Sequence, residues 1–156
     1  MKCQSFLIAA MLAQAGGILL GQTPQTPCCE MKIRSAQEDP AHLTVTIKNV
    51  ERQPVFMGVA RPERDFEVRI ASIGGRQPDR TVLGKRVQAG QVLSSLGTIE
   101  LKKGEESTED LNIGHLFDLM PGLYNVVLTR VVFVEDKPVQ LAAAIQVRIP
   151  QAQQGH

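Results

Sequence analysis

The side chains that most often carry out chemistry in proteins are few in this chain and stand apart from one another. The three histidines are His42, His115 and His156, and each is isolated in the sequence. A tetrahedral metal site needs three or four ligands that converge on one ion, so lone histidines of this kind predict solvated or capping side chains. No serine lies in a Gly-x-Ser-x-Gly turn, which exposes the nucleophile of an α/β-hydrolase. We therefore expect neither a metal site nor a cofactor.

Two pairs of acidic residues, Glu105-Glu106 and Glu109-Asp110, are the nearest approach to a catalytic carboxylate pair. Glycosidases need two carboxyl groups that face each other across a cleft and have separated pKa values. Neighbouring acids on one strand do not supply this arrangement, so the run predicts a solvated face. Gly74-Gly75 is not followed by a helix that would hold a phosphate. The sequence predicts a protein that is not an enzyme.

The cysteines are Cys3, Cys28 and Cys29, and only the last two remain if an N-terminal leader is removed. Adjacent cysteines close a strained eight-membered ring when they form a disulfide with each other. Each could instead bridge to another chain. The favoured interpretation is a pair in a linker just before the first strand, with no dedicated function, and the two bridged alternatives stay open.

Residues 1–21 have the layout of a secretory signal peptide. Lys2 precedes an apolar run over residues 6–13, and Ala13-Gln14-Ala15 supplies a small-x-small cleavage pattern, with Gly21 as a later alternative. The apolar residues at 18–20 extend this region, so an uncleaved anchor is the alternative. The interrupted run is short for a bilayer span of roughly 20 residues. We predict export, to the periplasm or to the outside of the cell.

The charge balance of the chain narrows the choice of partners. The 17 Lys and Arg residues face 16 Asp and Glu residues, a net charge of +1, and loss of Lys2 with the leader would bring the balance to zero. Such a protein has no long-range field to steer it toward nucleic acid or an anionic membrane. We therefore expect a protein partner, no nucleic acid and no small-molecule cofactor. The oligomeric state is left open.

Apolar residues recur with a period of two through most of the chain that follows a Pro/Thr/Gln-rich spacer at 22–29. Leu43, Val45 and Ile47 alternate with polar residues, as in a strand with one buried face. Strands are expected near residues 31–33, 43–47, 55–57, 66–70, 98–101, 107–113, 124–134 and 140–149, with weaker candidates at 81–83 and 87–93. Residues 114–119 predict a single helical turn, and no longer helix is expected.

Strands at this spacing, without crossover helices, predict an all-β fold. We expect an immunoglobulin-like antiparallel Greek-key β-sandwich of about seven to eight strands over residues 30–150, followed by a disordered tail at 151–156. Ala142-Ala143-Ala144 is the main local conflict, because alanine favours helix. The flanking β-branched residues favour a strand.

A corner motif precedes the long strand near the C-terminus. In Greek-key sandwiches a tyrosine at this position turns its hydroxyl back to hydrogen-bond the backbone a few residues upstream. Tyr124, the only tyrosine in the chain, follows Asp118-Leu-Met-Pro-Gly122-Leu. Gly122 and the proline before it suit a tight turn. We assign structural roles to Tyr124, Gly122 and Asp118.

Residues 43–149 resemble the immunoglobulin-like domain that precedes the catalytic unit of deuterolysin-type metallopeptidases. The resemblance lies in Leu101-Lys-Lys-Gly-Glu105, Asp110-Leu111, Phe117-Asp-Leu119, Gly122-Leu-Tyr-Asn-Val126 and, upstream, Lys85-Arg-Val87. It implies a fold and an extracellular setting. The chain lacks the His-Glu-x-x-His motif of the zinc site, so no catalytic residue carries over.

A second resemblance is to bacterial proteinase inhibitors of the BsuPI type, which are also sandwich domains. It is carried by Leu43-Thr-Val-Thr-Ile-Lys-Asn49, Pro54-Val-Phe56 and Asp65-Phe-Glu-Val68. This resemblance implies a loop that enters a protease cleft. It makes a secreted proteinase inhibitor the alternative to a non-catalytic binding or structural module of the cell envelope.

Basic residues concentrate between Arg61 and Arg86, and acidic residues between Glu100 and Asp118. One interpretation is that the two segments meet, within the domain or across molecules. The favoured interpretation is that both segments simply alternate charged residues on solvent-facing strand positions, because a surface ion pair contributes only about 0–1 kcal/mol. Loops on a rigid scaffold usually carry recognition. The segments 61–64 and 77–86 are therefore the expected contact surface, with Arg61, Arg64, Lys85 and Arg86 as candidate partner contacts.

Overall fold

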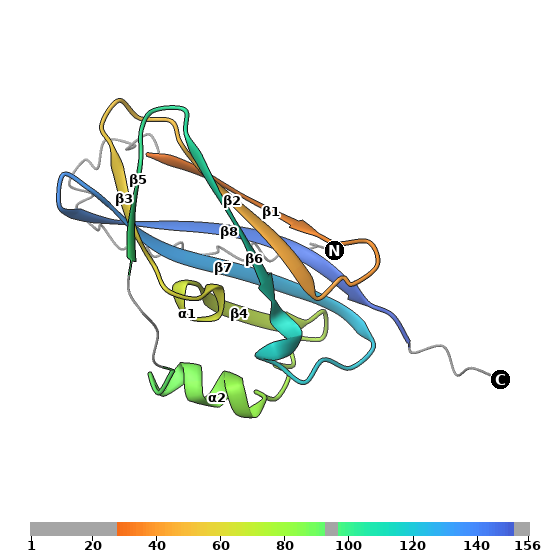
Figure 1. Ribbon diagram of the computed structural model, residues 1–156. Helices are drawn as coiled ribbons and strands as arrows, with labels where there is room; N and C mark the ends of the chain where they lie inside the picture. The colour runs from red at the N-terminus through yellow and green to blue at the C-terminus, as the bar shows by residue number, and fades with distance from the viewer. Residues whose placement is uncertain (1–27, 93–96, 152–156) are drawn as a thin grey trace, which may run out of the picture.

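The computed structural model describes residues 28–92 and 97–151. Within them, eight strands form two antiparallel sheets that pack face to face (Figure 1). The prediction of an all-β sandwich with seven to eight strands is confirmed. The predicted leader at 1–21, the spacer up to residue 27 and all but the first residue of the predicted tail lie outside the described residues, so those three assignments stay predictions.

The first sheet, called sheet A here, contains β1 (Cys29–Ser35), β2 (His42–Asn49) and β6 (Glu106–Asn112), in the order β1-β2-β6. The alternation predicted for β2 is present, because Leu43, Val45 and Ile47 are buried while their neighbours are not. β6 joins β2 only after the chain has passed through the other sheet. Two segments distant in the sequence therefore share one sheet.

The second sheet, sheet B, is built around a long hairpin. β7 (Gly122–Val134) pairs along its whole length with β8 (Lys137–Ile149), through a two-residue turn in which Glu135 and Asp136 both have positive φ. The other edge of β7 pairs with β4 (Glu67–Ser72) and then with β3 (Val55–Val59). β5 (Gly97–Leu101) extends the sheet beyond β3.

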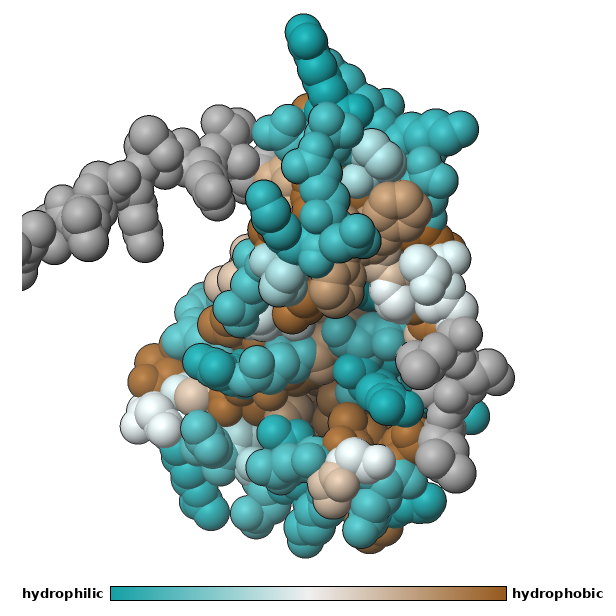
Figure 2. Space-filling view, turned by 90° about the vertical axis from the view of Figure 1, so that its left-hand side faces the viewer, coloured by the Kyte–Doolittle hydropathy of each residue, from teal (hydrophilic) through white to brown (hydrophobic). Residues whose placement is uncertain are grey.

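The core is one continuous apolar cluster between the two sheets. Leu43 and Leu111 from sheet A and Val126, Leu128 and Val132 from β7 have no accessible surface. Seen from the side of β3, β5 and the hairpin turn, hydrophilic side chains lie at the top and bottom of the molecule and apolar ones through its middle (Figure 2). The burial of this cluster is the dominant stabilising contribution, at about 25 cal/mol per Å² of apolar surface.

Three short helices interrupt the strands, and two of them were not predicted. They are α1 (Pro62–Asp65), α2 (Val82–Gln88) and the 3-10 turn η1 (Ile113–His115). The prediction of weak strands at 81–83 and 87–93 is wrong for the residues that the structure describes, because α2 occupies residues 82–88. η1 overlaps the helical turn expected at 114–119. None of the helices within residues 28–92 and 97–151 has the length and apolar character needed to cross a membrane.

The sequence does contain start and stop signals for α2. The hydroxyl of Thr81 accepts a hydrogen bond from the Gly84 N–H at 2.9 Å, which caps the N-terminus. Gly90, with φ of +68°, ends the helix, and the Gln91 N–H donates to the Arg86 carbonyl in a Schellman arrangement. A helix of only seven residues is too short to show a clear helical period, so these signals were outweighed by the strand-like alternation of the neighbouring sequence.

Candidate functional site

The predicted contact residues come together at one end of the molecule, although not on loops. Arg61 caps α1, Arg64 lies within it, and Lys85 and Arg86 lie in the last turn of α2. α1 and α2 are on the same side of the sandwich (Figure 1), and the Arg64 guanidinium donates to the Val92 carbonyl at 3.0 Å. We call α1, α2, η1 and the segment 76–81 the helical end.

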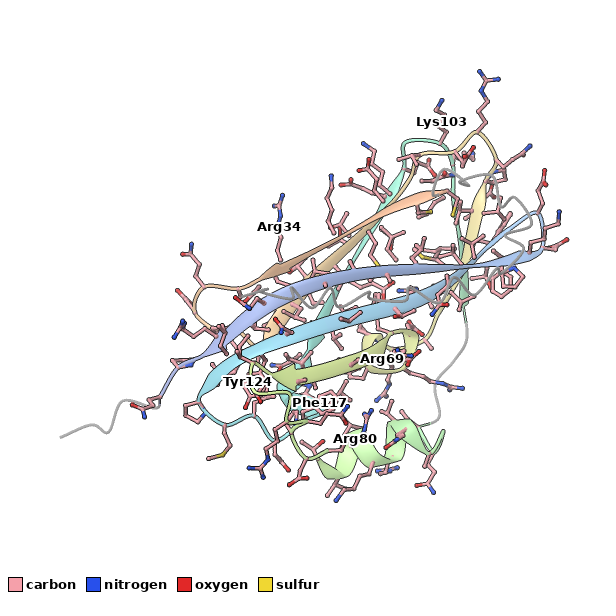
Figure 3. The ribbon with its side chains drawn as sticks, turned by 180° about the vertical axis from the view of Figure 1, so that it is seen from behind. Arg34, Arg69, Arg80, Lys103, Phe117 and Tyr124 are labelled. Carbon is pink, nitrogen blue, oxygen red and sulfur yellow. The ribbon has the colours of Figure 1, made fainter. Side chains whose placement is uncertain are left out.

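The helical end is held together by hydrogen bonds between the segment that precedes α2 and the segment around η1. The Thr81 N–H donates to the Leu116 carbonyl at 3.0 Å, and the Asp118 N–H donates to the Asp79 carbonyl at 2.9 Å. Between these bonds, the Arg80 guanidinium stacks over the Phe117 ring at 4.8 Å from its centre (Figure 3). These contacts fix α2 on the body of the domain.

Gly84 lets α2 approach η1 more closely than any other residue would allow. A Cβ atom at this position would lie 2.0 Å from the carbonyl oxygen of Leu116. Glycine is therefore required here because the packing leaves no room for a Cβ atom, and not because of the backbone angles. The position of α2 depends on this contact together with the Thr81 cap.

Four clefts open around the helical end within the described residues. A cleft of about 370 Å³ lies between α1, the start of β4 and α2, and one of about 580 Å³ lies beside α2 and His115. A third, of about 400 Å³, adjoins Tyr124, and the fourth, of about 510 Å³, lies on the other side of η1. Asp118 lines three of the clefts and Arg80 lines two. Shared lining residues join the clefts into one belt.

Charge at the helical end is mixed and only partly neutralised. Arg69 pairs with Glu67 at 2.8 Å, and His115 lies 3.6 Å from Glu63. Arg61, Lys85 and Arg86 are exposed and form no ion pair with any residue in the described part of the chain. Their charges are therefore available to an external group.

Large apolar side chains project from the same end. Val82 is 77% exposed and Met120 is 70% exposed, and both line clefts of the belt. Single exposed apolar residues are ordinary on protein surfaces. Two of them in a belt of clefts, beside available basic charges, make a mixed apolar and polar surface of the kind that protein interfaces use.

The Tyr124 hydroxyl hydrogen-bonds the backbone four residues upstream, as in a tyrosine corner. The Tyr124 hydroxyl donates to the Met120 carbonyl at 2.9 Å and accepts from the Met120 N–H at 3.2 Å. Gly122 has φ of +157°, a value that other residues rarely adopt. Asp118, by contrast, does not bond to the corner, because its N–H donates to the Asp79 carbonyl and its exposed carboxylate bonds to no described group. Its carboxylate instead lines the belt of clefts.

The placement of both cysteines before the first strand is wrong for Cys29, which lies in β1, whereas Cys28 directly precedes that strand. Cys29 is the first residue of β1 and pairs with Asn49, and the Cys28 carbonyl accepts from the Val50 N–H at 3.0 Å. Both are buried free thiols. Burial, together with the adjacent Cys28, raises the pKa of Cys29 to about 12. The thiolate is disfavoured, so Cys29 has the character of a packed, unreactive core residue.

A buried arginine was missed by the sequence analysis. Arg130 is 3% exposed and points into the core from β7, where its guanidinium pairs with Glu109 of β6 at 2.5 Å and donates to the Gly58 carbonyl at 2.8 Å. It also lies 3.8 Å from Asp65 and 4.8 Å from the centre of the Phe66 ring. The group ties α1, β3, β6 and β7 together.

The acidic run is accordingly not a wholly solvated face. The side chain of Glu109 is nearly buried, and its second carboxylate oxygen, Oε2, has no partner among the described residues. The alternation of β7 could have shown that Arg130 is buried, because this residue falls on the same inward face of the strand as Tyr124, Val126 and Leu128. Which acid would meet it depends on how the two sheets stack, and that is not a local property.

Comparison with known proteins yields weak structural likeness only. No protein-family model and no curated protein sequence matches the chain. A solved structure of a protein designated ApaA, from Bordetella pertussis, is 18% identical, with 80% of this chain and 94% of the other covered and a TM-score of 0.43. The resemblances to deuterolysin-type domains and to BsuPI-type inhibitors remain hypotheses.

Proposed function

We propose that this chain is an exported, non-catalytic module that binds a protein partner through its helical end. The observation that carries the proposal is the belt of clefts around Arg80 and Asp118, bordered by available basic charges and by exposed Val82 and Met120. The export part rests on the leader-like residues 1–21, and the non-catalytic part on the motifs that the sequence lacks.

The helical end is suited to binding because its backbone is already ordered. Association costs free energy for every side chain and loop that becomes fixed, so a surface held in place beforehand binds at lower cost. The Thr81–Leu116 and Asp118–Asp79 hydrogen bonds, the Arg80–Phe117 stack and the contact at Gly84 provide this order. The exposed apolar side chains would supply affinity, and the basic ones would orient the partner.

Affinity capture with matched bait variants tests the proposal. The purified protein is immobilised and exposed to envelope extract, alongside a Lys85→Glu/Arg86→Glu variant. The control is Arg34→Glu/Lys103→Glu, which makes the same change of charge on the opposite side of the molecule (Figure 3). Both pairs consist of exposed bases without ion pairs in the described part of the chain.

We expect the wild type and the control to capture the same protein. The helical-end variant should capture at least tenfold less of it, because it has lost two contact residues. Equal capture by all three baits would disprove recognition at this end. Detection of an unprocessed N-terminus by mass spectrometry of the protein from its native envelope would disprove cleavage of the leader.

Proteinase inhibition is the second candidate, and the structure supplies less for it. An inhibitory loop usually enters the protease cleft in extended form, as an added strand. Pro62–Asp65 is helical, and of the second segment expected to make contact, 77–86, only residues 77–81 lie outside a helix. Inhibition of a panel of serine proteases and metalloproteases by the wild type and by Arg80→Ala tests this candidate. If no protease is inhibited, the candidate is dismissed.

A further inference from the structure

The outer face of sheet B carries exposed apolar side chains of β7 on both sides of Thr129, which is 7% exposed. Side chains alternate along a strand, so Val127, Val131 and Phe133 of β7 point away from the core. Val131 is 48% exposed and Phe133 is 42% exposed, and Phe56 of β3, which pairs with Phe133, is also exposed. These residues form a patch over the middle and the hairpin end of β7.

β8 extends the patch without adding charge. Its outward residues lie opposite those of β7 in the register of the hairpin, and they are Pro138, Gln140, Ala142, Ala144 and Gln146. From Asn125 to Phe133, therefore, neither strand carries a charged side chain on this face. The small side chains of Ala142 and Ala144 leave the surface flat.

A flat, uncharged surface favours another sheet as its cover. None of the clefts described above is lined by an outward residue of β7 or β8, so this face has no hole for a single anchoring side chain. Two sheets with apolar faces pack about 10 Å apart with interdigitated side chains. The surface is complementary to a second copy of itself.

The area of the face agrees with the area that a specific dimer interface buries. Strands of 13 residues are about 43 Å long, and three neighbouring strands are about 14 Å wide, which makes the face on the order of 600 Å². Two copies would bury about 1,200 Å² in total, the lower limit for specific interfaces. β7, β8 and the adjoining β4 provide this area, and β4 turns to this side the charged residues Glu67 and Arg69, which pair with each other at the edge of the apolar patch.

The charges at the two ends of the face are also complementary. The acidic turn at Glu135 and Asp136 follows Thr129 by six residues, and Arg148 lies opposite Leu123, which precedes Thr129 by six residues. A two-fold axis that crosses the strands near Thr129 would therefore bring the acidic turn of one copy close to Arg148 of the other. We propose that two copies of this chain pack their β7–β8 faces together in this antiparallel arrangement.

Sedimentation and light scattering of the purified protein test the proposal. At micromolar concentrations the wild type is expected to have twice the mass of one chain. Val131→Glu places a charge in the centre of the patch and is expected to weaken association at least tenfold. Val82→Glu, the same change at the helical end, is the matched control and should leave the dimer intact, while circular dichroism checks that both variants fold.

Charge reversal tests the alignment of the two copies. Arg148→Glu is expected to weaken the dimer, and the addition of Glu135→Lys is expected to restore it. A monomeric wild type would overturn the proposal and leave the face to a different partner. A Val131→Glu protein that dimerises as the wild type does, or an Arg148→Glu variant without effect, would also overturn it.

Discussion

The outer faces of the two sheets differ although their inner faces share one core. Sheet A turns polar and charged side chains to solvent, and these bond to one another, as Lys32 does with Glu30 at 3.2 Å and Thr46 with Thr108 at 3.2 Å. Sheet B turns Val127, Val131 and Phe133 outward. Sheet A therefore has an outer face suited to water, whereas the central strands of sheet B have two faces suited to burial.

The difference can be followed in single strands. β2 alternates strictly, with Leu43, Val45 and Ile47 buried between polar residues. β7 has a nearly continuous apolar run, which is typical of strands covered on both faces. Its one inward charge, Arg130, is neutralised by Glu109 in the core.

The largest expected effect comes from breaking the charge pair that joins Arg130 of sheet B to Glu109 of sheet A. Arg130→Met would leave Glu109 and Asp65 near the core without their cation, at a cost of about 3–5 kcal/mol in the free energy of unfolding. Arg34→Met removes an exposed arginine without an ion pair in the described part of the chain from the outer face of sheet A, and should change the free energy of unfolding by less than about 0.5 kcal/mol. Denaturant unfolding measures both, and equal losses would contradict the assignment.

A second test concerns the helix beside β4, the edge strand of sheet B. Gly84→Ala forces a methyl group against the Leu116 carbonyl, so either α2 or η1 must move, at a cost of about 1–3 kcal/mol. Gly58→Ala is the control, because its Cβ would meet its nearest neighbour at 3.9 Å. If thermal unfolding ranks the two variants in the reverse order, the proposed packing of α2 is wrong.

A pH test addresses the inner face of sheet A, where Cys29 begins β1. The folded pKa of about 12 lies above the ordinary value of 9.0, so the unfolded chain loses this proton first as the pH rises. The free energy of unfolding should therefore fall between about pH 9 and pH 12. Cys29→Ala should reduce this fall, and an unchanged pH profile in the variant would show that other groups cause it.

Tyr124→Phe is expected to have a smaller effect. It removes the hydroxyl that bonds to both backbone groups of Met120, at a cost of about 1 kcal/mol, or a few degrees in Tm. The far-ultraviolet circular dichroism spectrum should not change, because the strands on either side keep their pairing. A Tm equal to that of the wild type would show that the corner is dispensable.

The smallest effects come from exchanging residue types between the two outer faces. Thr46→Val on sheet A and Val131→Thr on sheet B should each change the free energy of unfolding of the dilute protein by no more than about 0.5 kcal/mol. Only Val131→Thr should weaken self-association, as measured by sedimentation. If Thr46→Val alters association and Val131→Thr does not, the roles of the two faces are reversed.

Local patterns predicted most of the strands and the corner, because those features depend on neighbours in the sequence. The period of two marked β2 and β4, and the Asp118-to-Tyr124 stretch marked a turn whose hydrogen bonds span only four residues. The same reasoning failed for α2, whose Thr81 cap and Gly90 stop are separated by a helix too short for its period to stand out.

By itself, the sequence determined the all-β class, the inward faces and the tyrosine corner, since each follows from side-chain spacing along one strand or turn. Only the tertiary structure decided that Arg130 meets Glu109, that α1 and α2 lie at one end, and that apolar side chains on the outward side of β7 are exposed. The physical reason is that sheet stacking and strand order bring together residues far apart in the chain, and side-chain periodicity contains no information about which distant surface will be opposite.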